Sequence, residues 1–240
     1  MTITFEDDFA TDDFSLWDST NGAPIVDAVL SLPHVAVFTS VEDGEGDYAV
    51  KAVSDSPLHV IAKFALSSLP AEGTNTEILS AWTTTFGTKI FSLLFLKYDG
   101  VYYLDLLENG NDHSYEFSMV ADTLYTIEVR YVQNASGEYR VWFNGAEVIT
   151  VTGVDTSALT VAYIELGAQW ATAVFTIYAD DFKSGDAYLG STPPSGSTLT
   201  YQSIPISVTL TVGSQYLASG QSLELAQGST VFQVPSQVTV

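Results

Sequence analysis

The chain has 240 residues, 46% hydrophobic and 12% aromatic, so it can bury a sizeable core and is not a disordered chain. Its 29 acidic residues against 7 Lys and Arg give a net charge of −22, which argues against nucleic acid or an anionic membrane surface as a partner. The absence of cysteine excludes disulfides and thiolate chemistry, and no apolar run approaches the roughly 20 residues of a membrane helix.

From the N-terminus onward, strand-like segments follow one another and amphipathic helix patterns are nearly absent. No signal peptide is visible after Met1, and the first strand-like segment is Ile3-Thr4-Phe5. Turn dipeptides such as Asp99-Gly100 and Asn144-Gly145 separate later segments. This pattern predicts an all-β fold of antiparallel strands in two sheets, with strands at 24–30, 34–39, 47–53, 58–66, 76–85, 89–97, 101–107, 114–119, 124–132, 138–143, 146–151, 159–168 and 173–179.

The clearest hairpin is predicted over residues 124–151. The odd-numbered residues from Tyr125 to Tyr131 are apolar and are expected to face the core, with Thr126, Glu128 and Arg130 on the other side. Asn144-Gly145 predicts a tight turn of the primed type.

The two ends of this β-rich region carry similar acidic sequences. Glu6-Asp7-Asp8-Phe9 follows the first strand-like segment, and Asp180-Asp181-Phe182 follows the last. If the first and last strands lie side by side, these carboxylates converge at one edge, where they bind a cation, take up protons or repel one another.

A domain boundary is predicted near Gly190. Residues 1–190 form one β-sandwich, 191–197 form a Pro/Gly/Ser linker, and 198–240 form a β-rich tail or a truncated second domain. Forty-odd residues make a marginal domain, so self-association through 198–240 is one expected role for the tail.

Several motifs occur in the order found in a known superfamily. Phe5-Glu6-Asp7-Asp8-Phe9, Gly46-Asp47-Tyr48-Ala49-Val50-Lys51 and Val141-Trp142-Phe143-Asn144-Gly145 are examples. Over residues 3–190 the chain resembles the concanavalin A-like jelly rolls, which include laminin-G-like domains and jelly-roll carbohydrate-binding modules. The resemblance implies a two-sheet jelly-roll sandwich, but the superfamily hosts lectins, hydrolases, lyases and structural domains, so it does not decide function.

The resemblance also implies a structural calcium ion at the edge of the sandwich. Carried over to this sequence, its ligands are Glu6, Asp47 and Asp180 or Asp181. Carboxylate oxygens are suitable calcium ligands. The alternative is that these acids are solvated loop residues.

Sugar binding is the least demanding functional interpretation. It needs aromatic faces that stack on pyranose rings, with carboxylates and Arg nearby to form hydrogen bonds with the sugar hydroxyls. Trp142 is the best single candidate, although core packing is the commoner fate of an aromatic side chain. Strand parity predicts that the outward-facing residues are Trp82, Tyr103, Asp105, Glu128, Arg130, Arg140, Trp142, Tyr163 and Glu165.

Two kinds of enzyme remain as alternatives. The glucanase relatives carry a Glu-x-Asp-x-Glu strand that this chain lacks, and Glu45-Gly46-Asp47 is a partial match. A lyase needs a base and a cationic group for the uronate carboxylate, for which Arg130, with His113 and Tyr103 nearby, is a candidate. The Gln-x-His strand of such lyases is missing, and a polyanion is a poor partner for an acidic chain.

The sequence therefore favours a non-catalytic extracellular or cell-surface module that binds a glycan or mediates adhesion and holds a structural divalent cation. The alternatives are a structural cell-surface or virion component that assembles through 198–240, and a divergent polysaccharide lyase or hydrolase.

Overall fold

The computed structural model of the chain describes residues 2–84, 87–108 and 110–190, and every regular element in these ranges is a β-strand. One sheet, called the back sheet, contains eight strands: β1 (Ile3–Asp7), β3 (Ile25–Val29), β4 (Leu32–Thr39), β6 (Leu58–Leu66), β11 (Tyr125–Val132), β12 (Gly137–Phe143), β13 (Ala146–Val154) and β15 (Thr176–Gly185). The other, called the front sheet, contains seven: β2 (Ser19–Asn21), β5 (Tyr48–Ala52), β7 (Asn75–Trp82), β8 (Lys89–Tyr98), β9 (Val101–Glu108), β10 (Asn111–Phe117) and β14 (Tyr163–Gly167).

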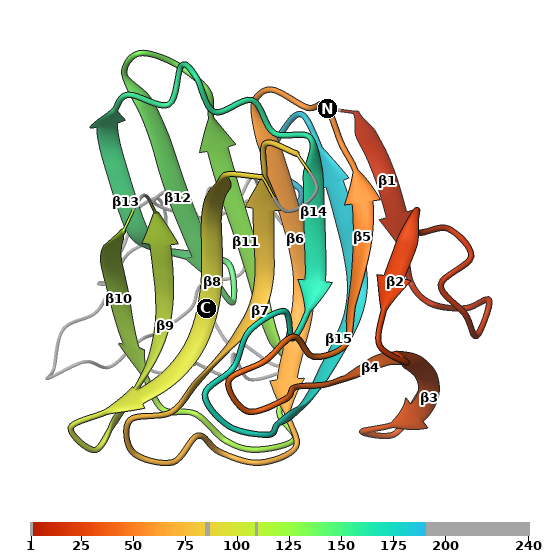
Figure 1. The fold of residues 1–240 in the computed structure, drawn as a ribbon. Helices are drawn as coiled ribbons and strands as arrows, with labels where there is room; N and C mark the ends of the chain where they lie inside the picture. Colours follow the sequence, from red (N-terminus) through yellow and green to blue (C-terminus); the bar gives the residue numbers. More distant parts are fainter. Residues whose placement is uncertain (1, 85–86, 109, 191–240) are drawn as a thin grey trace, which may run out of the picture. The chain divides into compact units, whose positions relative to one another are not determined.

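The strand order of both sheets is that of an antiparallel sandwich, with the front sheet lying over the back sheet (Figure 1). The back sheet runs β13-β12-β11-β6-β15-β4-β3, with β1 beside β15, and the front sheet runs β10-β9-β8-β7-β14-β5-β2. All of these strand pairs are antiparallel. The predicted all-β, two-sheet jelly-roll class is confirmed.

The core lies between the inward faces of the two sheets. The odd-numbered residues of β11, Tyr125 to Tyr131, belong to it, as do Val141 and Phe143 on β12. Asn144 and Gly145 follow with φ of 50° and 82°, the two positive values that a primed hairpin turn requires. The hairpin predicted at 124–151 is therefore confirmed.

Several strands differ from the sequence prediction; the segment predicted at 159–168, for example, forms a strand only over Tyr163–Gly167. The short strand β2 was not predicted, because three polar residues carry no hydrophobic pattern; its pairing with β5 is a backbone interaction. The strand predicted at 173–179 begins at Thr176 and continues to Gly185, past a bulge at which Asp181 adopts a φ of 51°.

The first and last strands lie side by side, as the paired acidic sequences suggested, with Glu6 opposite Lys183 and Asp7 opposite Phe182. Asp7 is buried, and this burial raises the pKa of its carboxyl group. Its Oδ1 accepts the Phe9 amide at 2.8 Å, and its Oδ2 accepts the Trp17 indole N–H at 2.8 Å. Asp7 therefore fastens the segment after β1 to the core.

Replacing Asp7 with alanine is expected to leave both donors buried without an acceptor, at a cost of about 1–3 kcal/mol for each donor. Asp8, its exposed neighbour, provides the control, because Asp8→Ala should change stability by no more than about 0.5 kcal/mol. Urea unfolding of the two variants measures the difference. Equal stability of Asp7→Ala and Asp8→Ala would refute the fastening role.

The linker and tail predicted at 191–197 and 198–240 lie outside the described residues. Within the residues that the structure describes, no helix is long and apolar enough to cross a membrane.

Candidate functional site

The nine side chains predicted to face outward lie on two different faces of the sandwich. The back sheet carries four of them on β11 and β12: Glu128, Arg130, Arg140 and Trp142. The front sheet carries the other five on β7, β9 and β14: Trp82, Tyr103, Asp105, Tyr163 and Glu165. Because the outer faces of the two sheets are on opposite sides of the core, the nine side chains do not form one site.

On the back face, the charged groups of β11, β12 and β13 form an ion-pair network. Arg130 Nη1 pairs with Glu138 Oε1, and Arg140 Nη2 lies 3.2 Å from Glu138 Oε2. Arg140 Nη1 also lies 3.3 Å from Glu147 Oε2. These are the two arginines of the chain, so its guanidinium groups already have carboxylate partners.

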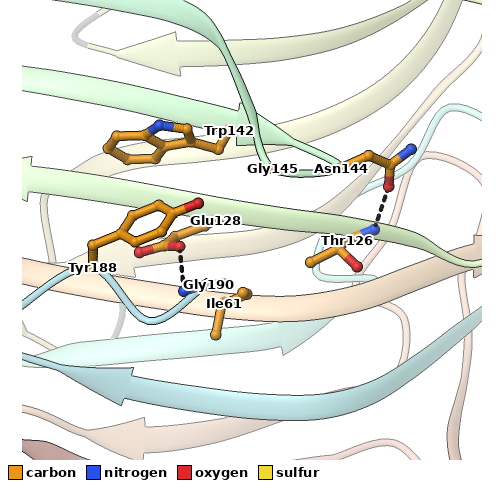
Figure 2. Close-up of a pocket in the computed structure, with 8 residues that line it drawn as sticks. All are labelled: Ile61, Thr126, Glu128, Trp142, Asn144, Gly145, Tyr188 and Gly190. Atoms are coloured by element: carbon orange, nitrogen blue, oxygen red, sulfur yellow. Dashed lines mark hydrogen bonds between the residues drawn. The ribbon is translucent and has the colours of Figure 1, made fainter. Parts of the chain in front are cut away.

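A pocket of about 240 Å³ also lies on the back face (Figure 2). The Glu128 carboxylate accepts the amides of Leu189 and Gly190, both at 2.9 Å, and lies 2.9 Å from His59 Nδ1. The Trp142 ring is 6% exposed, lies 5.1 Å from the Tyr188 ring and is stacked on His59. Glu128 and Trp142 therefore hold the segment after β15 against the sheet.

The front sheet places four polar side chains together on its central strands. Glu165 on β14 is opposite Ser80 on β7, and Ser80 is opposite Ser92 on β8. Glu77 lies on the same face as Ser80, because Ile78 between them belongs to a β-bulge. We call Glu77, Ser80, Ser92 and Glu165 the front-face cluster.

The front-face cluster is set back from the surface but is not part of the hydrophobic core. Its members are between 0 and 3% exposed, whereas the residues alternating with them, such as Leu79 and Ile164, pack into the core. The cluster therefore lies on the outer side of the sheet.

The two glutamates of the front-face cluster differ in their electrostatic surroundings. Lys89 Nζ donates to Glu77 Oε2 at 2.7 Å, which gives Glu77 a cationic partner. Glu165 Oε2 accepts the Ser80 hydroxyl at 3.2 Å, and Ser80 in turn accepts the Trp82 indole N–H at 2.9 Å. Burial, and to a smaller degree the charge of Glu77, raises the pKa of Glu165 to about 7.

Three oxygen atoms of the front-face cluster have no hydrogen-bond partner among the described residues. They are Glu77 Oε1, Glu165 Oε1 and Ser92 Oγ, and a fourth is Oε1 of Gln169, just beyond β14. A buried polar atom without a partner costs about 1–3 kcal/mol, so such atoms are rare unless water or a ligand completes them. These unpaired oxygens are concentrated on the outer side of the front sheet, which makes the front-face cluster the candidate polar site.

Aromatic side chains lie beside the front-face cluster. Tyr163 on β14 is opposite Trp82 on β7, so the two side chains are neighbours on one face. Trp82 is buried with Lys89 Nζ 4.8 Å from its ring centroid, whereas Tyr163 is partly exposed. The face therefore combines an accessible ring with carboxylates.

Asp105 and Tyr103 extend the polar face across β9. Burial raises the pKa of Asp105, whose Oδ1 accepts the Ser114 hydroxyl at 2.9 Å. Tyr103 is partly exposed and is opposite Leu96 on β8. Neither residue has a buried oxygen that lacks a partner among the described residues.

Each of the four residues named as calcium ligands has partners within the protein. Glu6 pairs with Lys183 at 2.6 Å, and Asp181 pairs with Lys63. Asp180 accepts the amide of Asp181, and Asp47 accepts the amides of Ala23 and Thr39. Within the described ranges, no three Asp, Glu, His or Cys side chains gather into a group that fits a metal ion. The calcium ion stays a prediction.

The residues considered for lyase chemistry are likewise apart. Arg130 lies on β11 of the back sheet, whereas Tyr103 and His113 lie on β9 and β10 of the front sheet. His113 Nε2 lies 3.3 Å from the buried Glu108, and His34 and His59 belong to the back sheet. The structure therefore does not assemble that constellation.

No family model matches the chain, and no curated protein matches its sequence. Solved structures share its fold. An endo-β-1,4-glucuronan lyase from the fungus Trichoderma reesei has a TM-score of 0.57 and 12% identity over 78% of this chain and 96% of its own. The cellulose-induced protein Cip1 has a TM-score of 0.57 and 15% identity over 78% of this chain and 99% of its own.

A variant of the alginate lyase Aly36B, solved in complex with an alginate trisaccharide, has a TM-score of 0.58. It is 11% identical over 76% of this chain and 98% of its own. Identities this low show a shared jelly-roll sandwich, and activity has to be argued from the site.

Proposed function

We propose that this chain is an extracellular carbohydrate-binding module whose binding surface is the outer face of the front sheet. One observation carries the proposal: three buried oxygens of the front-face cluster have no hydrogen-bond partner among the described residues and are next to a partly exposed tyrosine ring. Sugar hydroxyls donate to carboxylate and hydroxyl oxygens, and sugar rings stack on aromatic faces. The fold shared with proteins named for alginate, glucuronan and cellulose adds support.

The back face is a weaker candidate. The carboxylate of Glu128 and the guanidinium groups of Arg130 and Arg140 already have protein partners. Trp142 packs against Tyr188 and His59, so little of its ring remains for a sugar.

Replacing Tyr163 with alanine is expected to weaken glycan binding by about 10-fold or more, because the partly exposed ring next to the cluster is lost. Affinity electrophoresis measures the binding: a gel that contains a soluble polysaccharide retards the migration of a protein that binds it. Tyr98→Ala is the matched control, since Tyr98 is 68% exposed where β8 turns into β9.

Retardation that is lost in Tyr163→Ala and kept in Tyr98→Ala supports the front face. Equal retardation of both variants would exclude it as the binding surface. An unretarded parent protein on every uncharged and uronate polysaccharide tested would contradict carbohydrate binding.

A further inference from the structure

We infer that the carbohydrate on the front face is an extended, uncharged chain that lies along β7 and β14, with Trp170 as a second aromatic contact. This inference rests on the proposed function, because it concerns the ligand of the same face. It adds a contact residue outside the nine sequence candidates, a direction for the bound chain and a minimum length.

Trp170 is the exposed member of the four tryptophans. Its side chain is 46% exposed, whereas Trp17, Trp82 and Trp142 are between 6 and 9% exposed. It lies in the loop that connects β14 with β15, next to Ala171, which belongs to the core. Its ring is therefore accessible to a ligand without any rearrangement of buried side chains.

Backbone pairing places Trp170 on the outer face of the front sheet. Ala171 forms an antiparallel bridge with Thr76 near the start of β7. One residue along, the Glu77 amide donates to the Trp170 carbonyl oxygen at 2.9 Å, so Trp170 is opposite Glu77. Because Ala171 faces the core and side chains alternate, Trp170 and Glu77 point outward together.

Trp170 and Tyr163 mark the two ends of the front-face cluster along the strands. Tyr163 is opposite Trp82, toward the end of β7, and Trp170 is opposite a residue near its start. At about 3.3 Å per strand residue, the stretch from Glu77 to Trp82 separates the two ring positions by roughly 15 Å. One sugar cannot stack on both rings, so a ligand that uses both extends over several sugars along the strands.

A partly exposed ammonium group lies between the two ring positions. Lys89 on β8 is opposite Trp82, and its Nζ lies 2.7 Å from Glu77 Oε2. The Lys89 side chain therefore runs along the face from one end of the cluster toward the other. It is 28% exposed, and an ammonium group has three donors, so donors remain for sugar hydroxyls after the pairing with Glu77.

The charge of the face favours an uncharged chain. Glu77, Glu165 and Asp105 lie on it. Lys89, the cation in contact with the cluster, is paired with Glu77, and both arginines of the chain lie on the back sheet. A polyuronate would add negative charge to this face, and a protein of net charge −22 repels it at long range.

A chain that lay across the strands would contact a different ring. Tyr103 on β9 is partly exposed on the same face, and β8 separates β9 from β7. Neighbouring strands are about 4.8 Å apart, so Tyr103 lies at least about 10 Å to the side of the line from Tyr163 to Trp170. Tyr103 therefore distinguishes the two directions.

The test uses the whole 240-residue chain and an uncharged polymer that retards it, cut into a disaccharide and a hexasaccharide. Isothermal titration measures both affinities. The parent is expected to bind the hexasaccharide at least about 10-fold more tightly than the disaccharide, because one ligand then contacts both rings. Trp170→Ala should lose this gain, Trp170→Phe should keep most of it, and Tyr103→Ala, the matched control, should keep all of it.

Fluorescence quenching by acrylamide measures the contact at Trp170 separately from affinity. Trp170 dominates the quenching of the free parent, since the other three tryptophans are buried. The hexasaccharide should therefore lower the quenching of the parent and leave that of Trp170→Phe unchanged.

The outcomes separate this inference from the proposed function. A parent that is retarded by the polymer, with Trp170 unprotected and parental affinity in Trp170→Ala, would overturn the inference and leave the proposed function intact. Lost affinity in Tyr103→Ala with parental affinity in Trp170→Ala would overturn the direction along the strands. A parent that no polymer retards would overturn the inference and the proposed function together.

Discussion

Replacing Trp142 with alanine is expected to destabilise the sandwich by about 3–5 kcal/mol. The indole is 6% exposed, its ring centroid lies 5.1 Å from that of Tyr188, and it stacks on His59. Its removal opens a cavity on the back face and frees the segment that Glu128 holds through the amides of Leu189 and Gly190.

Urea unfolding measures this effect as a lower transition midpoint at an unchanged m-value. Trp170→Ala is the matched control, since Trp170 is 46% exposed and should change stability by no more than about 0.5 kcal/mol. A Trp142→Ala protein as stable as the parent would show that the ring is not a structural fastener. Loss of glycan retention in Trp142→Ala is therefore informative about binding only alongside a folding measurement.

The second large effect concerns pH. The carboxyl group of an unfolded glutamate titrates near 4.5, and burial raises the pKa of Glu165 to about 7 in the folded chain. Between these two values the folded chain binds more protons than the unfolded chain, so the free energy of unfolding falls as pH rises. The contribution is complete below pH 4.5 and is lost as pH rises through 7. Its size is at most about 3 kcal/mol.

Glu165→Gln should remove this dependence, because the amide does not titrate and keeps an oxygen for the Ser80 hydroxyl. Relative to the parent, the variant is expected to be more stable at pH 8 than at pH 4.5, as measured by urea unfolding at both values. The difference between parent and variant isolates Glu165 from Asp7 and Asp105, whose pKa values are also raised by burial. Glu116→Gln, at an exposed position, should follow the parent. A constant difference between parent and Glu165→Gln would contradict a buried, protonatable Glu165.

The fold could be predicted because its signals are local. Alternation along 125–131 identifies the core face of β11, and Asn144-Gly145 identifies the turn that follows β12. The repeated acidic sequence also led to the pairing of β1 with β15. Glu6 and Asp181 each pair with a lysine on a neighbouring strand, and burial together with the charges of Asp181 and Asp8 raises the pKa of Asp180. The acids do not form a metal-binding group among the described residues.

The candidate site depends on two features that the sequence does not display. Strict alternation from Trp82 predicts that Ile78 faces outward and Glu77 faces the core. The β-bulge at Ile78 changes this alternation, so Ile78 faces the core and Glu77 faces outward. Glu77 was therefore missed, and so was Lys89, its partner. The Lys and Glu twelve residues apart carry no pattern that marks an ion pair.

The division of the nine candidates between two faces was also hidden. Alternation shows which side chains leave the core, but the sheet to which a strand belongs is decided by pairing between distant segments. Glu165 and Glu128 both alternate with core residues, yet β14 pairs with β7 while β11 pairs with β6. Strand parity alone therefore identified side chains that point away from the core, but it did not show that they lie on two different sheets.

The claim that the front face binds carbohydrate is tested most directly by the indole N–H signals of the four tryptophans in a ¹H–¹⁵N spectrum, assigned with Trp→Phe variants. On titration with an oligosaccharide of the retained polymer, the Trp82 signal should shift, because its N–H donates to Ser80 within the front-face cluster. The Trp17 signal should stay in place, because the Trp17 indole N–H donates to Asp7 on β1 of the back sheet. The signal of the buried Trp142 should also stay in place. A shift of Trp142 with an unmoved Trp82 would place the ligand on the back face and contradict the account.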